Sequence, residues 1–263
     1  MPDSIHSGHR ERIREQYKAH GADAFLDHQF LELLLTYAIP RRDTNELAHQ
    51  LLARFGSLEG VVTAEIAQLM LVDGIGESAA VFLRMQGDLF RRLRLHRLAD
   101  TRGNIRLTSP VEAARYAVSQ LSLNTYETVL AVCLNAKKAV QSCERVVGGS
   151  LSEAQIYPRN IAESALLHRA HGILLIHNHP SGDPTPSKAD IETTESVRAA
   201  LESIGVQLFD HIIVGGEHAY SFSTGAVIGV SGAEAEVFSL SDYQALQAQA
   251  VRTGALLRVM EPY

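Results

Sequence analysis

Two histidines, one residue apart, end an apolar run in the stretch LLIHNHPSGDPTPSKAD, residues 174–190. Alternate side chains of a strand point to the same side, so His177 and His179 would project together where a buried strand ends. Burying polar groups in such a place is costly unless they find partners. Paired imidazoles are common zinc ligands, with nitrogens about 2.0–2.1 Å from the ion. The spacing therefore predicts a metal site.

The segment after the second histidine offers a third ligand. Pro180 cannot continue a sheet ladder, so it releases the chain into a loop. Asp190 follows in the first turns of an expected helix, from which its carboxylate can return to the same ion. Two histidines and one carboxylate leave a fourth tetrahedral position for water, the pattern of a catalytic zinc. The same set can hold non-haem iron, but hydrolysis without redox chemistry fits better.

Alternating helices and strands surround these residues and must position them. The apolar patterns predict a mixed sheet in an α/β (α+β) domain over residues 101–229. We expect its helices at 109–121, 157–172 and 186–205, and its strands at 127–135, 139–148, 172–179, 206–216 and 219–223.

The N-terminal part of the chain has helical patterns throughout. The polar stretch 99–110 lacks periodicity and contains Gly103 and Pro110, so we place a domain boundary there. This organisation predicts an all-helical module over residues 1–100. A C-terminal tail over residues 230–263 carries one expected helix, at about 241–257, and no recognisable chemistry.

Composition limits the class of protein. The formal net charge is -6 and the pI is about 6.0, so the chain lacks the basic excess typical of general nucleic-acid binding. No apolar run is long enough to span a bilayer, and the polar N-terminus has no secretory h-region. The two cysteines, Cys133 and Cys143, would not face each other in the hairpin expected at 127–148. We therefore expect a cytoplasmic protein without a membrane partner.

The metal motif resembles a known family signature. HNHPSGDPTPSKAD has the form His-x-His, seven residues, then Ser-x-x-Asp, which is similar to the JAMM (MPN+) metalloprotease signature. Three segments resemble, more narrowly, sequences of the RadC family of bacterial proteins: YPRNIAESAL, HNHPSGDPTPS and FDHIIVGG. HRERIREQY and LLLTYAIPRRDTNELA, near the N-terminus, resemble the same family. The likeness covers residues 8–222, and the sequence after Gly225 does not match.

This resemblance implies a cytidine-deaminase-like MPN fold with Zn²⁺ held by His177, His179 and Asp190. It also implies that Glu144 is a general base for a zinc-activated water and that Ser187 donates a hydrogen bond to the oxyanion.

Other acidic residues near the motif leave the identity of the base open. Glu127, Glu153 and Glu163 lie in the same region of the sequence, and an exposed glutamate on a strand is usually only solvated. The pair Asp210-His211 is followed by isoleucine and not by another histidine, which favours packing or support of the metal ligands.

A second motif lies in the helical module. Gly74-Ile75-Gly76 separates two expected helices in LVDGIGESAA, as in helix-hairpin-helix modules. Glycines allow close approach to a phosphate, and the following helix offers free N–H groups at its start. The alternative is a turn that only joins two packed helices.

These motifs leave two functions open. The first is a zinc-dependent metallohydrolase that cleaves a peptide or isopeptide bond in a protein or peptide substrate that the sequence does not identify. The second, which the resemblance to RadC proteins implies, is a non-enzymatic, DNA-associated repair or recombination factor that binds DNA through the helix-hairpin-helix module containing residues 74–76. An amidohydrolase barrel is excluded, because too few residues follow His177 to complete one.

Overall fold

The computed structural model describes residues 4–40, 42–146, 157–231 and 234–252. The chain divides into two compact units, Met1–Phe90 and Arg91–Tyr263. The division falls inside helix α6 (Glu77–Leu98), before the polar stretch where we expected the boundary. The early part of α6 packs into the core of the first unit through Ala80 and Leu83, whereas Arg94 at its end donates a hydrogen bond to Ser122 of the second.

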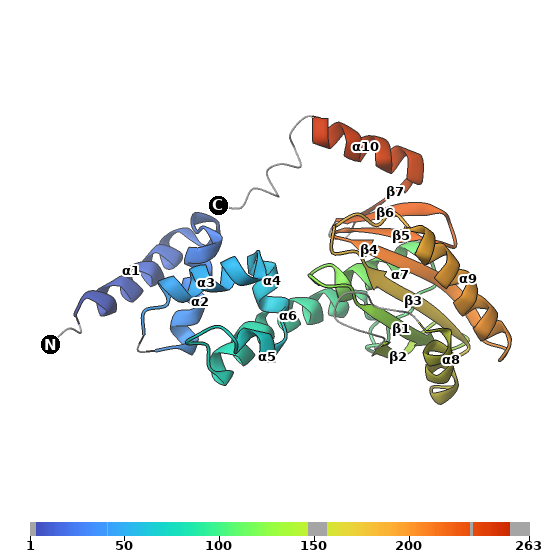
Figure 1. The fold of residues 1–263 in the computed structure, drawn as a ribbon, viewed down its shortest axis with the longest axis horizontal. Helices are drawn as coiled ribbons and strands as arrows, with labels where there is room; N and C mark the ends of the chain where they lie inside the picture. The colour runs from blue at the N-terminus through green and yellow to red at the C-terminus, as the bar shows by residue number, and fades with distance from the viewer. Residues whose placement is uncertain (1–3, 41, 147–156, 232–233, 253–263) are drawn as a thin grey trace. The chain divides into compact units, whose positions relative to one another are not determined.

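The first unit is helical, as the sequence predicts (Figure 1). Its core is formed by leucines and small apolar residues at helical spacing, among them Leu31, Leu35, Leu47 and Leu51, which are almost fully buried. Its elements are α1 (Ser4–His20), the 3₁₀-helix η1 (Ala22–Ala24), α2 (Asp27–Ala38), α3 (Asn45–Phe55), α4 (Leu58–Thr63), α5 (Ile66–Leu69) and the first part of α6.

The second unit contains a seven-stranded mixed sheet of order β2-β1-β3-β4-β5-β6-β7, which confirms the predicted fold class. The central pair β3 and β4 is parallel, and the other pairs are antiparallel. The elements are α7 (Pro110–Leu121), β1 (Val129–Leu134), β2 (Val140–Arg145), α8 (Pro158–Leu167), β3 (Gly172–Asn178), α9 (Lys188–Glu202), β4 (Gln207–Gly215), β5 (His218–Ser221), β6 (Ala226–Ser231), β7 (Glu234–Ser239) and α10 (Leu240–Arg252).

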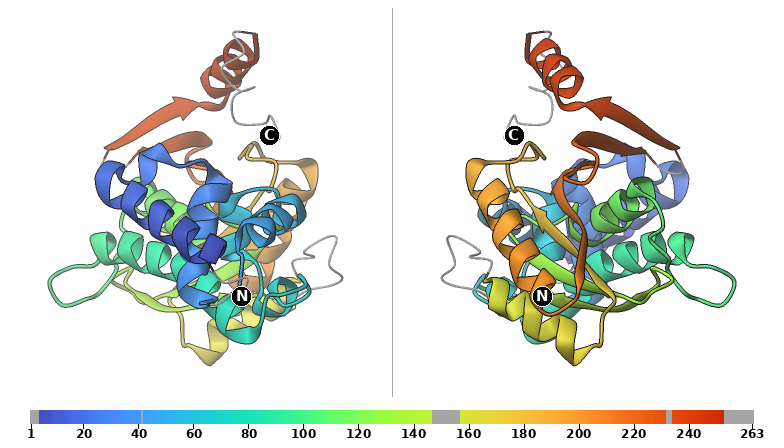
Figure 2. Two further views of the ribbon diagram at one scale, coloured as in Figure 1. Left: turned by 90° about the vertical axis from the view of Figure 1, so that its left-hand side faces the viewer. Right: turned by 90° about the vertical axis from the view of Figure 1, so that its right-hand side faces the viewer.

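Helices cover both faces of this sheet (Figure 2). On β3, Leu174 and Ile176 point toward α7, and Ile173 and Leu175 point toward α8 and α9. Because strand side chains alternate, His177 shares the face of Leu175 and lies on the α9 side. The buried central strand thus carries the first histidine to the start of the helix that holds the third predicted ligand.

The C-terminal part differs most from the expectation. After Gly229 we expected only a tail with one helix, but β6 and β7 extend the sheet by two strands before α10. The sequence EAEVFS of β7 has a weak strand pattern, and its pairing with β6 stabilises it. Tyr243 of α10 is buried and packs against His218 of β5, with ring centroids 5.1 Å apart.

The two cysteines are arranged as the sequence predicts. In the β1–β2 hairpin Cys133 pairs with Ser142, and Cys143 pairs with Val132, so the two thiols lie on opposite faces of the sheet. Both cysteines are free.

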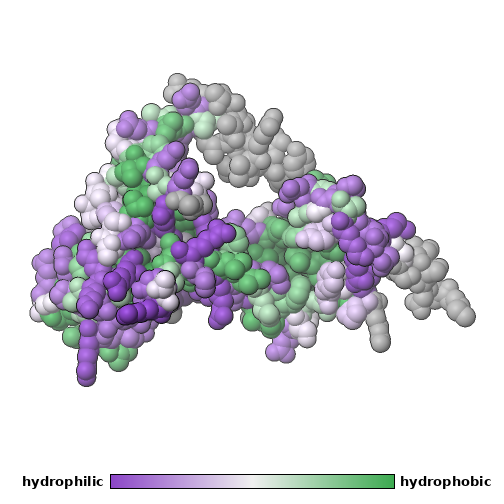
Figure 3. Space-filling model, turned by 180° about the vertical axis from the view of Figure 1, so that it is seen from behind, coloured by the Kyte–Doolittle hydropathy of each residue, from purple (hydrophilic) through white to green (hydrophobic). Residues whose placement is uncertain are grey.

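The surface is mixed in character. In the view of Figure 3, hydrophobic areas lie between larger polar areas. Along α6, four hydrophobic residues at intervals of four each have more than a third of their surface exposed: Val81, Met85, Leu89 and Leu93. Within the described residues, no helix combines the length and the apolar character that crossing a bilayer requires.

Candidate metal centre

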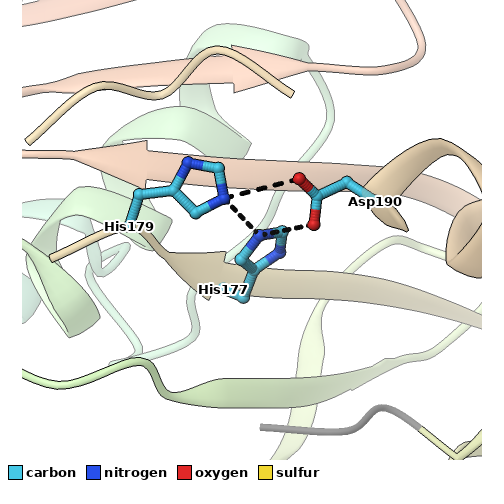
Figure 4. A group of neighbouring side chains, drawn as sticks. All are labelled: His177, His179 and Asp190. Carbon is cyan, nitrogen blue, oxygen red and sulfur yellow. Dashed lines mark hydrogen bonds and ion pairs between the residues drawn. The ribbon is translucent and has the colours of Figure 1, made fainter. Parts of the chain in front are cut away.

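The two histidines and the aspartate converge at one end of β3 (Figure 4). Nε2 of His177 lies 3.1 Å from Nε2 of His179 and 3.1 Å from Oδ1 of Asp190. Nε2 of His179 lies 3.4 Å from Oδ2 of Asp190. The side chain of His177 is fully buried, whereas those of His179 and Asp190 are 20% and 12% exposed. The cluster is therefore open to solvent on the side of His179.

The geometry of the three side chains fits a zinc ion. Two ligand atoms that are each about 2.0–2.1 Å from a tetrahedral zinc are about 3.3 Å apart. The three separations, 3.1, 3.1 and 3.4 Å, match that edge length. Among the described residues, His177, His179 and Asp190 form the cluster whose ligand atoms all lie within 4.8 Å of one another.

The helix start at Ser187 orients the aspartate. Ser187 is the N-cap of α9, and its hydroxyl accepts a hydrogen bond from the backbone N–H of Asp190 at 3.2 Å. The hydroxyl and backbone N–H of Ser187 both donate to Oδ2 of Asp190, at 2.6 and 2.7 Å. This capping box holds the carboxylate toward the histidines. The capping box requires a partner three residues after the N-cap, which explains the Ser-x-x-Asp spacing.

The charges of the cluster favour a cation. Burial opposes ionisation of Asp190, but its contacts with His177 and His179 and the hydrogen bond from Ser187 outweigh burial and hold its pKa below the ordinary value. The contact with Asp190 raises the pKa of His179 against the opposing effect of burial. Both shifts indicate that a proton is stabilised between these side chains, and a metal cation would meet the same carboxylate.

The loop from Pro180 to Pro186 fixes the second histidine. The backbone carbonyl of Asp183 lies 2.9 Å from Nδ1 of His179. A carbonyl only accepts, so Nδ1 carries the proton and, in the neutral ring, Nε2 keeps its lone pair for a metal. The loop in turn packs on Gly215 of β4, where an added Cβ would lie 2.6 Å from the carbonyl oxygen of Gly182 and 2.7 Å from Cδ of Pro184. A residue with a side chain at position 215 would therefore displace the loop.

His211 supports the first histidine from β4. Its Nε2 lies 2.8 Å from Nδ1 of His177, and its ring stacks on Phe222 at a centroid distance of 4.9 Å. On the other side, its Nδ1 lies 2.7 Å from the hydroxyl of Thr194. Burial holds the pKa of His211 well below its ordinary value, so the ring is neutral at pH 7. Thr194 was not predicted from the sequence, although its place one turn after Asp190 puts it on the same face of α9.

Glu144 makes its contacts away from the three ligands. Its carboxylate accepts a hydrogen bond from the hydroxyl of Ser164 at 2.7 Å and lies 3.3 Å from Nε2 of His168. It pairs in register with Ala131 of β1, which pairs with Leu175 of β3. Glu144 thus shares the sheet face of His177 but is two strands away from β3.

Glu127 lies close enough to the metal ligands for its charge to act on one of them. It is exposed and precedes Val129, which pairs directly with His177. Its negative charge contributes to the raised pKa of His179. The neighbouring residue Thr128 donates its backbone N–H to the side chain of Asn178, at 2.9 Å. Of the other glutamates in the region, Glu163 pairs with Arg159, and Glu153 lies outside the described residues.

The Gly74-Ile75-Gly76 motif lies between α5 and α6, as expected. Gly74 has φ 94°, and an added Cβ there would lie 2.5 Å from the guanidinium of Arg42. Ile75 is buried in the core of the first unit, whereas nothing lies within 4 Å of a Cβ added at Gly76. The positive φ and the close neighbours therefore explain Gly74 without a bound phosphate, and Gly76 is the position with free space around it.

Two family models match this chain. One, described as a RadC-like JAB domain, covers residues 107–227, and one described as UPF0758 N-terminal covers residues 6–81. Both end before β7 and α10. A UPF0758 protein of Fusobacterium nucleatum is 34% identical over 227 residues, which is 84% of this chain and 97% of the relative. A UPF0758 protein of Ruegeria pomeroyi is 36% identical over 224 residues, with the same shares covered.

Proposed function

The chain belongs to the family of UPF0758 proteins with a RadC-like JAB domain, and we propose that it is a zinc-dependent hydrolase of peptide or isopeptide bonds. The observation that carries this proposal is the convergence of His177, His179 and Asp190 at the separations of a tetrahedral ligand set. Three protein ligands leave one position open, as in catalytic sites, whereas structural zinc sites are usually closed by four.

Bound zinc would supply a Lewis acid that polarises a carbonyl and lowers the pKa of a bound water to about 7. The chain contributes the environment. His177 is buried and held by β3, whereas His179 is partly exposed and marks the side from which a substrate would enter. Asp190 is locked by the N-cap of α9, so the ligand set is held in place before any substrate binds.

A glutamate would act as the general base, and two candidates have different support. The family resemblance implies Glu144, which here is engaged with Ser164 and His168. Glu127 is free of such contacts in the described part of the chain, and its charge reaches His179. We therefore favour Glu127 as the residue that takes the proton from water, with Glu144 as the alternative.

Ser187 is the candidate donor to the oxyanion that forms on the substrate carbonyl. Its hydroxyl lies 2.6 Å from Oδ2 of Asp190 and thus stands directly beside the ligand set. A hydroxyl has only one hydrogen, so Ser187 would have to turn it from Asp190 to the substrate as negative charge develops. The backbone N–H of Ser187 would continue to hold Asp190 during this change.

The decisive experiment compares protein cleavage in cells. Cells that lack the endogenous gene would carry the parent, Asp190→Asn or the double variant Glu127→Gln/Glu144→Gln, and new protein N-termini would be measured. We expect cleavage products that occur with the parent and with the control Glu163→Gln, and that are absent from Asp190→Asn and the double variant. Glu163→Gln is the matched control, because Glu163 pairs with Arg159 on the surface of α8. Identical N-termini in all four strains would contradict a protease function.

A further inference from the structure

A continuous hydrogen-bonded chain joins two of the metal ligands behind the site. Nδ1 of His177 lies 2.8 Å from Nε2 of His211, and Nδ1 of His211 lies 2.7 Å from Oγ1 of Thr194. Oγ1 of Thr194 then lies 2.6 Å from the backbone carbonyl oxygen of Asp190. His177, His211 and Thr194 are each at most 1% exposed, so no solvent competes for these contacts.

The direction of every hydrogen bond in this chain follows from its last member. The carbonyl of Asp190 can only accept, so the single hydroxyl hydrogen of Thr194 is donated to it. The oxygen of Thr194 must then accept from His211, so Nδ1 of His211 carries the proton. In the neutral ring of His211, Nε2 then has no proton and can only accept a hydrogen bond. The donor of the hydrogen bond between the two rings must therefore be Nδ1 of His177.

We infer that His211 and Thr194 are positioning residues that fix the ligand tautomer of His177. With the proton on Nδ1, the lone pair of His177 is on Nε2, the atom that faces His179 and Asp190. A metal-binding histidine generally donates its other N–H to a carboxylate, a carbonyl or water. Here the acceptor of that N–H is a second imidazole, His211, which donates in turn to Thr194, and Thr194 donates to a backbone carbonyl. None of the groups in this relay adds a negative charge behind the site.

The relay also links the positions of the two ligands. It begins at the ring of His177 on β3 and ends at the backbone of Asp190 on α9, through a residue of β4. Movement of α9 away from the sheet would break the contact between Thr194 and His211, and the tautomer of His177 would no longer be determined. The geometry of the ligands and the protonation of the first ligand are therefore coupled.

The tautomer can be observed without any metal. Long-range ¹H–¹⁵N NMR spectra of the metal-free, full-length protein distinguish protonation on Nδ1 from protonation on Nε2, and comparison with His177→Ala assigns the signals. We expect His177 and His211 to be protonated on Nδ1 in the parent and in Thr194→Ser, which keeps the hydroxyl. In Thr194→Val, which has a similar shape, we expect the Nδ1 form of both rings to lose its dominance.

Zinc affinity provides the second measurement. This measurement rests on the proposed function, whereas the NMR measurement does not. Removing a partner of this kind typically weakens metal binding by about 10–100-fold. We expect such a loss in Thr194→Val and in His211→Phe, which keeps an aromatic ring beside Phe222, and near-parental affinity in Thr194→Ser. Thermal unfolding would check that each variant is folded.

The outcomes separate this inference from the function. If the parent binds no zinc, the proposed function fails, and the NMR tautomers still decide whether the relay exists. A His177 that carries no proton on Nδ1 in the metal-free parent would overturn the inference. Equal zinc affinities of Thr194→Val and Thr194→Ser would overturn it too, since a packing role alone predicts no difference that depends on the hydroxyl.

Discussion

Nε2 of His177 lies 3.1 Å from Oδ1 of Asp190, and a proline-containing loop separates the two residues in the chain. The contact exists because β3 ends and α9 begins at the same edge of the sheet. Neither residue is held by the other alone, since Ser187 caps the helix and orients the carboxylate, and His211 engages the ring of His177. The pair is therefore held by contacts that lie outside the loop connecting the two residues.

The ligand set predicts the metal content of the purified protein. We expect about one zinc per chain by elemental analysis, the number that one three-ligand site holds. His177→Ala and Asp190→Ala should each lose most of it. His171→Ala is the control, because His171 packs near Phe209 and is not part of the cluster. Undiminished zinc in both ligand variants would contradict the assignment.

The two candidate bases predict different kinetic effects. A base touches the water and not the metal, so Glu127→Gln should keep its zinc and lower the hydrolysis rate by about 10²–10⁴-fold. Glu144→Gln should keep both zinc and most of the activity, since Glu144 contacts Ser164 and His168. The measurement is the rate on a substrate found by the cleavage experiment. The reverse pattern would identify Glu144 as the base.

The pKa shifts predict how the stability of the metal-free protein varies with pH. The pKa of folded His179 is raised, so its contribution is full below about pH 6.5, the unfolded value, and is lost as pH rises through the folded pKa. The pKa of folded Asp190 is lowered, so its contribution is present above about pH 4 and lost only in stronger acid. The lowered pKa of His211 acts in the opposite direction, so urea unfolding should show the contribution of His179 as a stability advantage of the metal-free parent over Asp190→Asn that falls from pH 6 to pH 9.

The variant Asp190→Asn provides the control for this pH dependence. It removes the main cause of the raised pKa of His179 and leaves the burial of His211 unchanged, so the difference in stability between the two proteins isolates the contribution of His179. Zinc affinity should change in the opposite direction and rise with pH, because the metal competes with the proton for His179. A stability advantage over Asp190→Asn that rises between pH 6 and pH 9 would contradict the predicted charge balance.

Gly215 predicts that the loop and the metal site are coupled. Gly215→Ala places a Cβ against Gly182 and Pro184, so the loop must move and carry the carbonyl of Asp183 away from His179. We expect weaker zinc binding, measured by competition with a chelator. Gly229→Ala is the matched control, since its Cβ would meet neighbours at 3.4 Å or more. Equal zinc affinities in the two variants would show that the loop position does not matter.

The helical module predicts a test of DNA binding that avoids unfolding. Gly74 is unsuitable, because a side chain there meets Arg42 and the residue has positive φ. Gly76→Asp adds a carboxylate in open space at the start of α6, where a phosphate would bind. If the motif binds DNA, this variant should lose low-salt binding of the full chain to duplex DNA, and Gly76→Ser should keep it. Binding that is absent in the parent, or unchanged in Gly76→Asp, would favour the packing explanation.

Much of the fold follows from local patterns. The helical character of the first unit and the elements from α7 to β5 were predicted, because these segments have a strong period or a clear turn signal, such as Pro110 or Gly172. The strands β6 and β7 were missed. The strand pattern of β7 is weak, and this outer strand exists because its backbone pairs with β6, a contact that no local pattern reveals.

The sequence by itself determined the two histidines, the aspartate and the helix cap beside it, because those residues are close in the chain and their spacing alone puts them on a strand end and a helix start. Only the tertiary structure decided what surrounds them. His211 contacts His177 from β4, Thr194 contacts His211 from α9, the charge of Glu127 acts on His179, and Gly215 contacts the loop. Such contacts depend on the order and register of strands, which a free-energy balance over the whole sheet sets and no short segment encodes.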